Sequence, residues 1–179
     1  GAYDVLFSNF DLYYPMLRKL IKQYSFIQGV DLDIEETVSL TNVKKLINQL
    51  TTDFGTDFIL TMAPVANSLL SDYPGLGGFV YKDLLHSKEG SLLNWFNAQF
   101  YFQYTKDIFD KCVGNGYSPD KIVCGMISSI YNFENALQQI KLIKEDYPKF
   151  GGVYVWEYFN CPPDPKNPYR WSELINQQL

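Results

Sequence analysis

The sequence predicts an α/β fold of parallel strands and helices, and three observations lead to this prediction. Segments with apolar residues at helical spacing alternate with short apolar runs along the 179 residues, and strict alternation of this kind implies a parallel sheet. No G-x-G-x-x-G follows the first predicted strand, so a dinucleotide-binding fold lacks its fingerprint. Polar and acidic residues gather at the carboxyl ends of the predicted strands, as they do in a TIM barrel.

Helices are predicted where apolar residues recur three and four positions apart. Ser39 or Thr41 is expected to cap the second helix, and Gly114-Asn115-Gly116 is expected to end the fourth. The expected helices cover residues 10–24, 38–53, 81–86, 106–113, 133–146 and 171–178.

Strands are predicted where short apolar runs lie between turn residues. The second strand is expected to end at Pro64, and residues 65–90, which are rich in Gly and Pro, are predicted to be a loop with one short helix. The expected strands cover residues 26–35, 57–62, 94–102, 122–127 and 152–158.

The composition argues against several classes of partner and cofactor. The net charge is −5 and no Lys/Arg cluster appears, which argues against binding to nucleic acid or to an anionic membrane. No apolar run approaches the roughly 20 residues that span a bilayer. Cys112, Cys124 and Cys161 form no C-x-x-C, so the sequence predicts neither a disulfide framework nor a zinc site, and no metal or organic cofactor is expected.

The predicted strand 26–35 carries a row of acidic residues. Asp31, Asp33 and Glu35 stand at every second position, with aliphatic residues between them. Alternate side chains of a strand point to opposite sides, so one side is aliphatic and the other carries three carboxyl groups. Burying such a row costs several kcal/mol unless the groups share protons or find donors. We therefore expect an enclosed catalytic cavity, in which one carboxyl group keeps a proton beside another that stays ionised.

Two other interpretations of the acidic row remain. The segment fits a half-buried edge strand whose acidic side is solvated. It also resembles the start of a calcium-binding EF-hand loop. Calcium is disfavoured, because Glu36 stands where that loop needs a glycine and because Leu32 and Ile34 fill the positions between the acids.

The acidic row resembles the D-x-x-D-x-D-x-E signature of glycoside hydrolase family 18, which contains chitinases and endo-β-N-acetylglucosaminidases. Residues 60–64 (LTMAP), 97–101 (NAQFY) and 151–160 (GGVYVWEYFN) resemble the fifth, sixth and eighth barrel strands of that family. The likeness covers nearly the whole chain and is closest to the fungal-type endo-β-N-acetylglucosaminidases. One departure is Gln28, which stands where many members have the first Asp of the signature.

The resemblance implies a (β/α)8 TIM barrel, of which this chain supplies about five strands and their helices. Residues 1–179 are then a single domain, the C-terminal portion of a TIM-barrel catalytic domain whose first three strands are absent. An open remnant of this kind has unpaired sheet edges. Either a separate N-terminal segment completes the barrel, or the chain is a fragment that must dimerise, swap or aggregate.

The resemblance also implies catalytic roles. Glu35 is the general acid that protonates the leaving oxygen. Asp33 orients the 2-acetamido group of the substrate, whose carbonyl oxygen attacks the anomeric carbon, and Asp31 shares a proton with Asp33. Family 18 differs in this substrate assistance from glycosidases that use two carboxyl groups directly. Tyr101 is expected to donate its hydroxyl to the acetamido carbonyl.

A second group of residues is expected to hold the oligosaccharide. Trp156 resembles the tryptophan on which the pyranose ring stacks, and packing in the core is an equal alternative for it. Asn97 and Gln99 are expected on the same side of their strand as Tyr101. The substrate-binding residues are then Trp156, Gln99, Asn97, Met62 and Tyr158, with Met62 as part of the wall.

The leading functional prediction is a retaining glycosidase that hydrolyses β-1,4-linked N-acetylglucosamine, with the chitobiose core of N-glycans slightly favoured over chitin as substrate. A catalytically silent, lectin-like barrel is the alternative from another class. The presence of Asp33 and Glu35 favours the enzyme, because such lectins usually lose one of the two. A third alternative is an inactive fragment. The compartment is open, and the resemblance favours a secreted protein only slightly.

Overall fold

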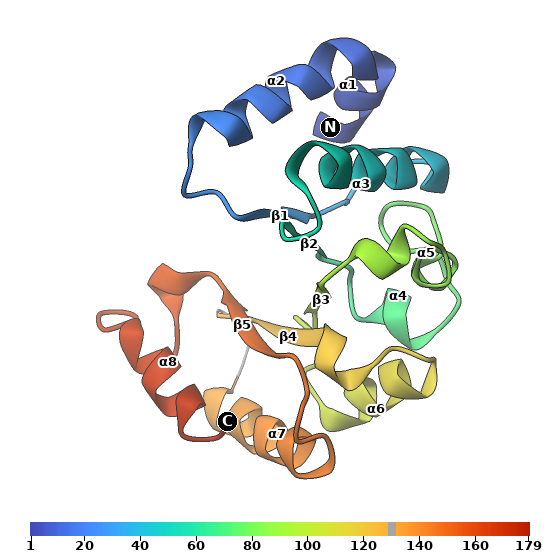
Figure 1. Ribbon diagram of the computed structural model, residues 1–179. Coiled ribbons are helices and arrows are strands. Elements are labelled where there is room, and N and C mark those ends of the chain that lie inside the picture. The colour runs from blue at the N-terminus through green and yellow to red at the C-terminus, as the bar shows by residue number, and fades with distance from the viewer. Residues whose placement is uncertain (129–131) are drawn as a thin grey trace. The chain divides into compact units, whose positions relative to one another are not determined.

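A computed structural model of the chain describes residues 1–128 and 132–179, and these form two compact units. The N-terminal unit comprises Gly1–Pro64 and Asp72–Asn94, and the C-terminal unit comprises Val65–Ser71 and Trp95–Leu179. Each unit contains parallel strands joined by helices (Figure 1).

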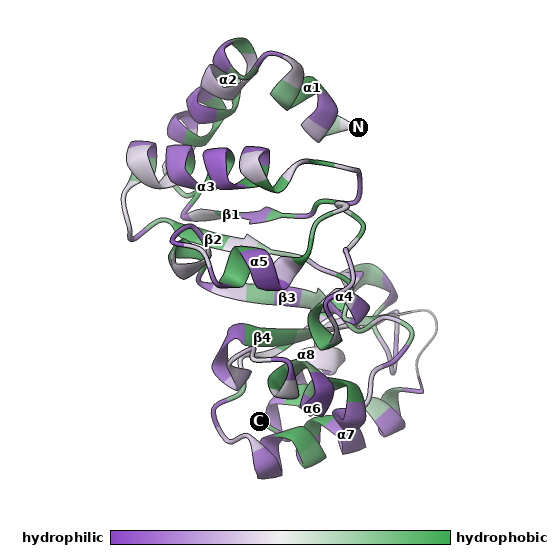
Figure 2. Ribbon diagram, turned by 90° about the vertical axis from the view of Figure 1, so that its right-hand side faces the viewer, coloured by the Kyte–Doolittle hydropathy of each residue, from purple (hydrophilic) through white to green (hydrophobic). Residues whose placement is uncertain are grey.

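The N-terminal unit is built on two parallel strands and a long helix. Its elements are α1 (Ala2–Ser8), α2 (Phe10–Gln23), β1 (Gly29–Leu32), α3 (Leu40–Phe54), β2 (Ile59–Met62), α5 (Tyr81–Leu85) and a 3-10 turn (Gly90–Leu92). The two strands pair from Gly29 opposite Ile59 to Leu32 opposite Met62. The helix α3 lies along this pair, and α2 lies on the far side of α3 (Figure 2). The buried residues of α3 form one apolar stripe, which comprises Val43, Leu46, Ile47 and Leu50.

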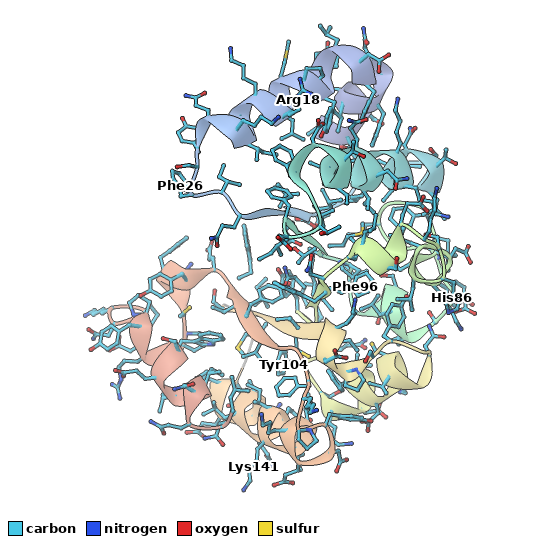
Figure 3. All side chains as sticks on the ribbon, in the orientation of Figure 1. Arg18, Phe26, His86, Phe96, Tyr104 and Lys141 are labelled. Atoms are coloured by element: carbon cyan, nitrogen blue, oxygen red, sulfur yellow. The ribbon has the colours of Figure 1, made fainter. Side chains whose placement is uncertain are left out.

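The C-terminal unit contains three parallel strands. Its elements are α4 (Asn67–Leu70), β3 (Trp95–Gln99), α6 (Lys106–Gly114), a 3-10 turn (Pro119–Lys121), β4 (Ile122–Ile127), α7 (Phe133–Asp146), β5 (Gly152–Trp156), a 3-10 turn (Tyr158–Asn160) and α8 (Tyr169–Asn176). The central strand β4 pairs with β3 on one side and with β5 on the other. Phe96 and Tyr104 point into the interior of this unit, whereas Lys141 points outward (Figure 3).

Most predicted elements are confirmed. The strand at 122–127 and the helix at 133–146 have the predicted bounds, and Ser39 rather than Thr41 caps α3 by accepting a hydrogen bond from the Asn42 backbone N–H. Two predictions are wrong: residues 65–90 contain the short helix α4 besides α5, and no helix was predicted where α1 lies.

Four strands are shorter than predicted, and the difference is largest for the first and the third. The strand expected over 26–35 ends at Leu32, whose carbonyl accepts the N–H of Ala63 as the last bond of the ladder. The register of the two strands ends there, with Leu32 opposite Met62. The strand expected over 94–102 ends at Gln99, where the chain turns.

The carboxyl group of Asp53 joins α2 to α3. It accepts hydrogen bonds from Gln49 (3.1 Å), from the Tyr14 hydroxyl (2.8 Å) and from Arg18 (3.2 Å). These donors favour the ionised form and so lower the pKa of Asp53. The hydrogen bonds from Gln49 and Tyr14 contribute more to this shift than Arg18 does.

We expect Asp53→Asn to remove part of the acid sensitivity of folding. A carboxyl group whose pKa is lowered on folding stabilises the folded state above its unfolded pKa of about 3.9, and this stabilisation is lost as the pH falls through the lower, folded pKa. The variant should therefore be less stable than the parent at pH 6 to 7, and its stability should fall less steeply below about pH 4. Urea unfolding at a series of pH values measures both effects, and parallel curves for the two proteins would refute the role of Asp53.

Within residues 1–128 and 132–179, no helix combines the length and the apolar character needed to cross a bilayer. Cys112, Cys124 and Cys161 are buried as free thiols, and burial raises the pKa of the Cys112 thiol to about 12.

Candidate active site

The acidic row lies at the carboxyl end of β1. Asp31 belongs to the strand, and Asp33 and Glu35 follow it in extended chain without a ladder partner in β2. The alternation continues past the strand, because Leu32 and Ile34 are 5% and 3% exposed whereas the three acids are exposed. The predicted division into an aliphatic side and an acidic side is therefore confirmed, although only its first half is strand.

The expected enclosure of the row is wrong for the described chain. All three acidic side chains are open to solvent, because α3 lies on the other side of the strand pair and covers its apolar side (Figure 2). This exposure agrees with the alternative of a half-buried strand that has a solvated acidic side. The acidic row therefore carries little desolvation free energy, because water solvates its carboxylates.

Two residues that the sequence analysis did not select contact or approach the row. Thr61 is buried opposite Asp31 in the β1–β2 register, and its hydroxyl donates a hydrogen bond of 2.6 Å to the Asp31 carboxylate. Tyr3, from α1, is half-buried, and burial followed by the charges of Asp33 and Asp31 raises the pKa of its hydroxyl well above the usual value. Tyr3 therefore stays protonated at neutral pH and supplies a neutral hydrogen-bond donor near the row.

We expect Thr61→Val to weaken the N-terminal unit and to loosen Asp31. The change keeps the shape of the side chain and removes the donor, so the expected loss in unfolding free energy is about 1 kcal/mol. Thr61→Ser keeps the hydroxyl and is the matched control. Chemical denaturation measures the loss, and equal stability of the Val, Ser and parent proteins would contradict the assignment.

The second group of predicted residues lies in the C-terminal unit. Asn97 and Gln99 are half-buried in β3, and Tyr101 lies in the turn that follows rather than in the strand itself. The side-chain oxygen of Asn97 accepts a hydrogen bond of 2.9 Å from the indole of Trp95. Asn97 is thus fixed by its neighbour two residues earlier.

Tyr154 connects this group to the neighbouring strands. Its hydroxyl lies 3.3 Å from the Asn97 carbonyl and 3.4 Å from the Tyr101 hydroxyl, and the rings of Tyr101 and Tyr154 meet edge to face at 6.5 Å. Tyr154 is paired across the sheet with Gly125, where the absence of a Cβ leaves room for the ring. The sequence analysis missed Tyr154, because an aromatic residue inside an apolar strand has the pattern of a core residue.

The remaining predicted residues differ in accessibility. Trp156 ends β5 and is 59% exposed, and Tyr158 in the following turn is exposed to the same extent, so both are open to a ligand. Met62 is fully buried, and its side chain can form only the wall that the sequence analysis also allowed for it. His86 is exposed at the end of α5 (Figure 3).

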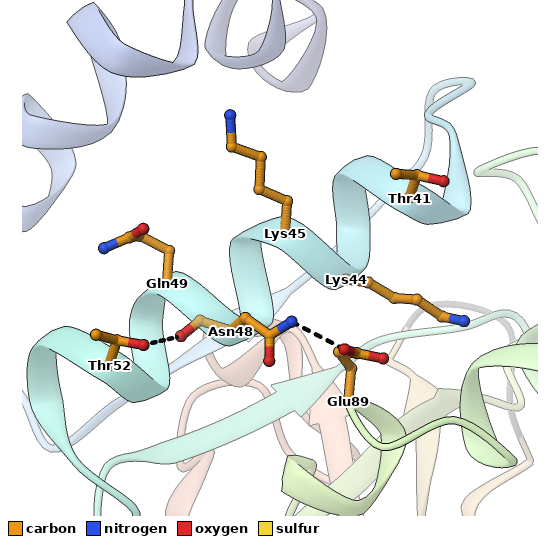
Figure 4. Close-up of a pocket in the computed structure, with 7 residues that line it drawn as sticks. All are labelled: Thr41, Lys44, Lys45, Asn48, Gln49, Thr52 and Glu89. Atoms are coloured by element: carbon orange, nitrogen blue, oxygen red, sulfur yellow. Dashed lines mark hydrogen bonds between the residues drawn. The ribbon is translucent and has the colours of Figure 1, made fainter.

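A separate groove lies on the polar side of α3 (Figure 4). There the Asn48 amide donates a hydrogen bond of 2.9 Å to Glu89, and the Thr52 hydroxyl donates one of 2.7 Å to the Asn48 carbonyl. None of the predicted site residues and no aromatic side chain lines this groove. Across the part of the chain that the structure describes, no cluster of three or more His, Cys, Asp or Glu side chains could hold a metal ion.

Comparison with known proteins finds several similar solved structures. One is a fungal endo-β-N-acetylglucosaminidase from glycosyl hydrolase family 18, at 34% identity and a TM-score of 0.88 over 96% of this chain and 63% of that chain. Another is the chitinase ChiC from Aspergillus fumigatus, at 33% identity and a TM-score of 0.85 over 99% of this chain and 68% of that chain. No protein-family model and no curated protein matches.

The predicted fold class is confirmed by these two structures. The chain has the α/β fold of part of a TIM barrel, and it spans less than two thirds of the length of the fungal endo-β-N-acetylglucosaminidase. The strands and helices of each unit follow each other as in such a barrel.

Proposed function

Because the chain belongs to glycoside hydrolase family 18, we propose that it carries the catalytic residues of a retaining glycosidase that hydrolyses β-1,4-linked N-acetylglucosamine. One observation carries the proposal: the sequence D-x-D-x-E stands at the carboxyl end of β1, with its three acids on one side and Leu32 and Ile34 buried on the other. The carboxyl ends of the strands are where TIM-barrel enzymes hold their catalytic groups.

In the proposed reaction, Glu35 gives its proton to the glycosidic oxygen as the bond to the leaving sugar breaks. The carbonyl oxygen of the substrate's own 2-acetamido group attacks the anomeric carbon and forms a cyclic, positively charged oxazoline. Asp33 orients the acetamido group and balances its charge. Water, deprotonated by Glu35, then opens the ring from the other side. Two inversions give net retention of configuration.

The neighbours of these acids support the proposal by holding them in place. Thr61 fixes Asp31 through the hydrogen bond of 2.6 Å. In the C-terminal unit, Tyr154 holds the hydroxyl of Tyr101, which is the proposed donor to the acetamido carbonyl.

The proposed substrate surface is made of aromatic and amide side chains. Trp156 is exposed at the end of β5 and offers its ring to one side of a pyranose, while Asn97 and Gln99 offer amide groups to the sugar hydroxyls. Tyr158 extends the aromatic surface. Met62, which is buried, belongs to the wall and not to the contact surface.

The natural substrate is tested by comparing two oligosaccharides of the same linkage. We propose the chitobiose core of N-glycans, so a high-mannose glycopeptide should be cleaved with a higher kcat/KM than chitin oligomers. The reverse order would make the protein a chitinase. Binding of either sugar by the natural protein without any turnover would overturn the enzyme and support the lectin-like alternative.

The proposed mechanism predicts a bell-shaped pH–rate profile with its maximum on the acid side of neutral. Glu35 must be protonated to act as the acid, and the Asp31–Asp33 pair must be at least partly ionised to balance charge. Initial rates on the better substrate measure the profile between pH 4 and 9. A flat profile over this range would argue against Glu35 as the acid.

A further inference from the structure

An exposed phenylalanine stands at the rim of a small cavity in the C-terminal unit. The cavity has a volume of about 190 Å³ and lies between the loop at 65–67 and the turn at 99–103. Phe102 belongs to its lining, yet the side chain is 75% exposed. An exposed aromatic ring beside a cavity offers one of its faces to a ligand in that cavity.

The frame of the cavity is held by the backbone. Val65 forms a parallel bridge with Gln99, and the N–H of Ala66 donates a hydrogen bond of 3.1 Å to the Gln99 carbonyl. Phe100 is buried, and its backbone N–H donates a hydrogen bond of 2.9 Å to the carbonyl of Gly125 on the neighbouring strand. The two walls are therefore fixed relative to each other.

The chemistry of the lining selects a neutral, polar ligand. No charged side chain is among the lining residues, and three of them, Asn67, Gln99 and Gln103, carry amide groups. An amide group carries both hydrogen-bond donors and an acceptor. It can therefore pair with a sugar hydroxyl, which donates one hydrogen bond and accepts others. The face of a phenyl ring carries negative potential and attracts the weakly positive C–H groups on one side of a pyranose.

The size of the cavity suits one sugar ring and not a longer ligand. Sites for drug-sized ligands run from about 300 to 1,000 Å³, and this cavity is smaller. The open rim at Phe102 lets a longer chain continue into solvent on either side of the ring.

We propose that Phe102 and the amides of Asn67 and Gln103 form a subsite for one neutral pyranose unit of the substrate, next to the unit whose acetamido group meets Tyr101. The assignment rests on the proposed function, because Tyr101 lines the same cavity and immediately precedes Phe102. The ring of Phe102 stacks on the sugar, and the amides bind its hydroxyls. This subsite sets how strongly a longer oligosaccharide is held.

The test measures binding without turnover, in the natural protein carrying Glu35→Gln. Chitin oligomers of two to five units and a high-mannose glycopeptide are titrated into this parent and into versions that also carry Phe102→Ala or Phe102→Tyr. We expect Phe102→Ala to weaken binding of the better oligosaccharide about 3- to 10-fold, and Phe102→Tyr to keep the affinity within about twofold, since the ring is retained.

A matched control separates the subsite from a general loss of surface aromatics. Phe26 is 78% exposed and lies before β1, at the end of that strand opposite to the acidic row, so Phe26→Ala should leave the affinity unchanged. Thermal unfolding shows that each variant is folded. Asn67→Ala with Gln103→Ala, which leaves the ring in place, should also weaken binding.

Three results distinguish the inference from the proposed function. Weaker binding by Phe102→Ala, rescued by Tyr, supports the subsite whether or not the natural protein turns the sugar over. Equal affinity of Phe102→Ala and the Glu35→Gln parent overturns the subsite and leaves the proposed function standing. If the parent binds neither sugar, both the subsite and the proposed substrate class are overturned.

Discussion

Replacing Glu35 by glutamine should lower the hydrolysis rate of the natural protein by about 10²- to 10⁴-fold, which is the usual contribution of a general acid. The amide keeps the size and polarity of the side chain but has no proton to give to the glycosidic oxygen. Binding depends on the sugar surface and not on this proton, so KM should change little while kcat falls. Initial rates with a chitin oligomer and a high-mannose glycopeptide measure the change.

The neighbouring glutamate provides the control. Glu36 follows Glu35 directly, but its carboxylate accepts the backbone N–H of Tyr3 at 2.6 Å and stands outside the alternating row. Glu36→Gln should therefore keep the rate within a few-fold of the parent. Equal losses in the two variants would show that the effect is structural, and full activity of Glu35→Gln would remove it from the proposed mechanism.

The choice of leaving group sharpens this test. General acid catalysis matters most when the leaving oxygen is a poor leaving group, such as a sugar hydroxyl. A nitrophenyl leaving group departs without a proton. Glu35→Gln should therefore lose far less activity on a nitrophenyl glycoside than on an oligosaccharide. A loss of the same size on both substrates would point to a role other than proton donation.

Local pattern was enough to predict most of the architecture. The strand at 122–127 is a pure apolar run between turn residues, and the helix at 133–146 has a clear amphipathic stripe and a proline two residues after its end. Such elements are decided by their own residues, and the structure reproduces their bounds. The strand at 26–35 was predicted too long, because the alternation of side chains continues past Leu32, where the pairing with β2 ends.

The acidic row could also be found from local pattern, because alternation places Asp31, Asp33 and Glu35 on one side in any extended chain. The residues that contact the row and the neighbouring site could not be found in this way. Thr61 contacts Asp31 across 30 positions of sequence, and Tyr154 contacts Tyr101 across 53. A threonine and a tyrosine inside apolar strands have no signal of their own, and only the register of the parallel strands reveals what they touch.

The enclosure of the row was the expectation that failed. Repulsion among three close carboxylates led to the prediction of a buried, proton-sharing group, but carboxylates that are exposed to water repel each other far less than buried ones do. Sequence alone gives the cost of burying such a row and cannot say whether the row is buried. The described residues leave it solvated.

Gly125→Ala is expected to destabilise the C-terminal unit. A Cβ at this position in β4 would lie closer than 3.0 Å to the ring of Tyr154, which is nearer than side chains approach. The ring or the strand must move, and overpacking of this kind costs about 1 to 3 kcal/mol of unfolding free energy. Because Tyr154 lies against the Tyr101 hydroxyl and the Asn97 carbonyl, a shifted ring should also displace Tyr101.

The displaced tyrosine gives Gly125→Ala a second effect, on the proposed reaction. A misplacement of about 1 Å in a catalytic group can cost roughly 10²-fold in rate, so we expect kcat to fall about 10- to 100-fold. Gly114→Ala is the control, because nothing lies within 4 Å of its added Cβ in α6. That change should raise stability by about 0.4 to 1 kcal/mol and leave the rate unaltered.

A double-mutant cycle identifies the ring of Tyr154 as the cause. If the clash with this ring is what destabilises Gly125→Ala, then adding Gly125→Ala to a Tyr154→Ala protein should cost less than about 0.5 kcal/mol, because the space is already empty. The two single changes are then strongly non-additive in urea unfolding. Additive losses would mean that the glycine is needed for the backbone of β4 itself, and Tyr101 would lose its proposed support from this strand.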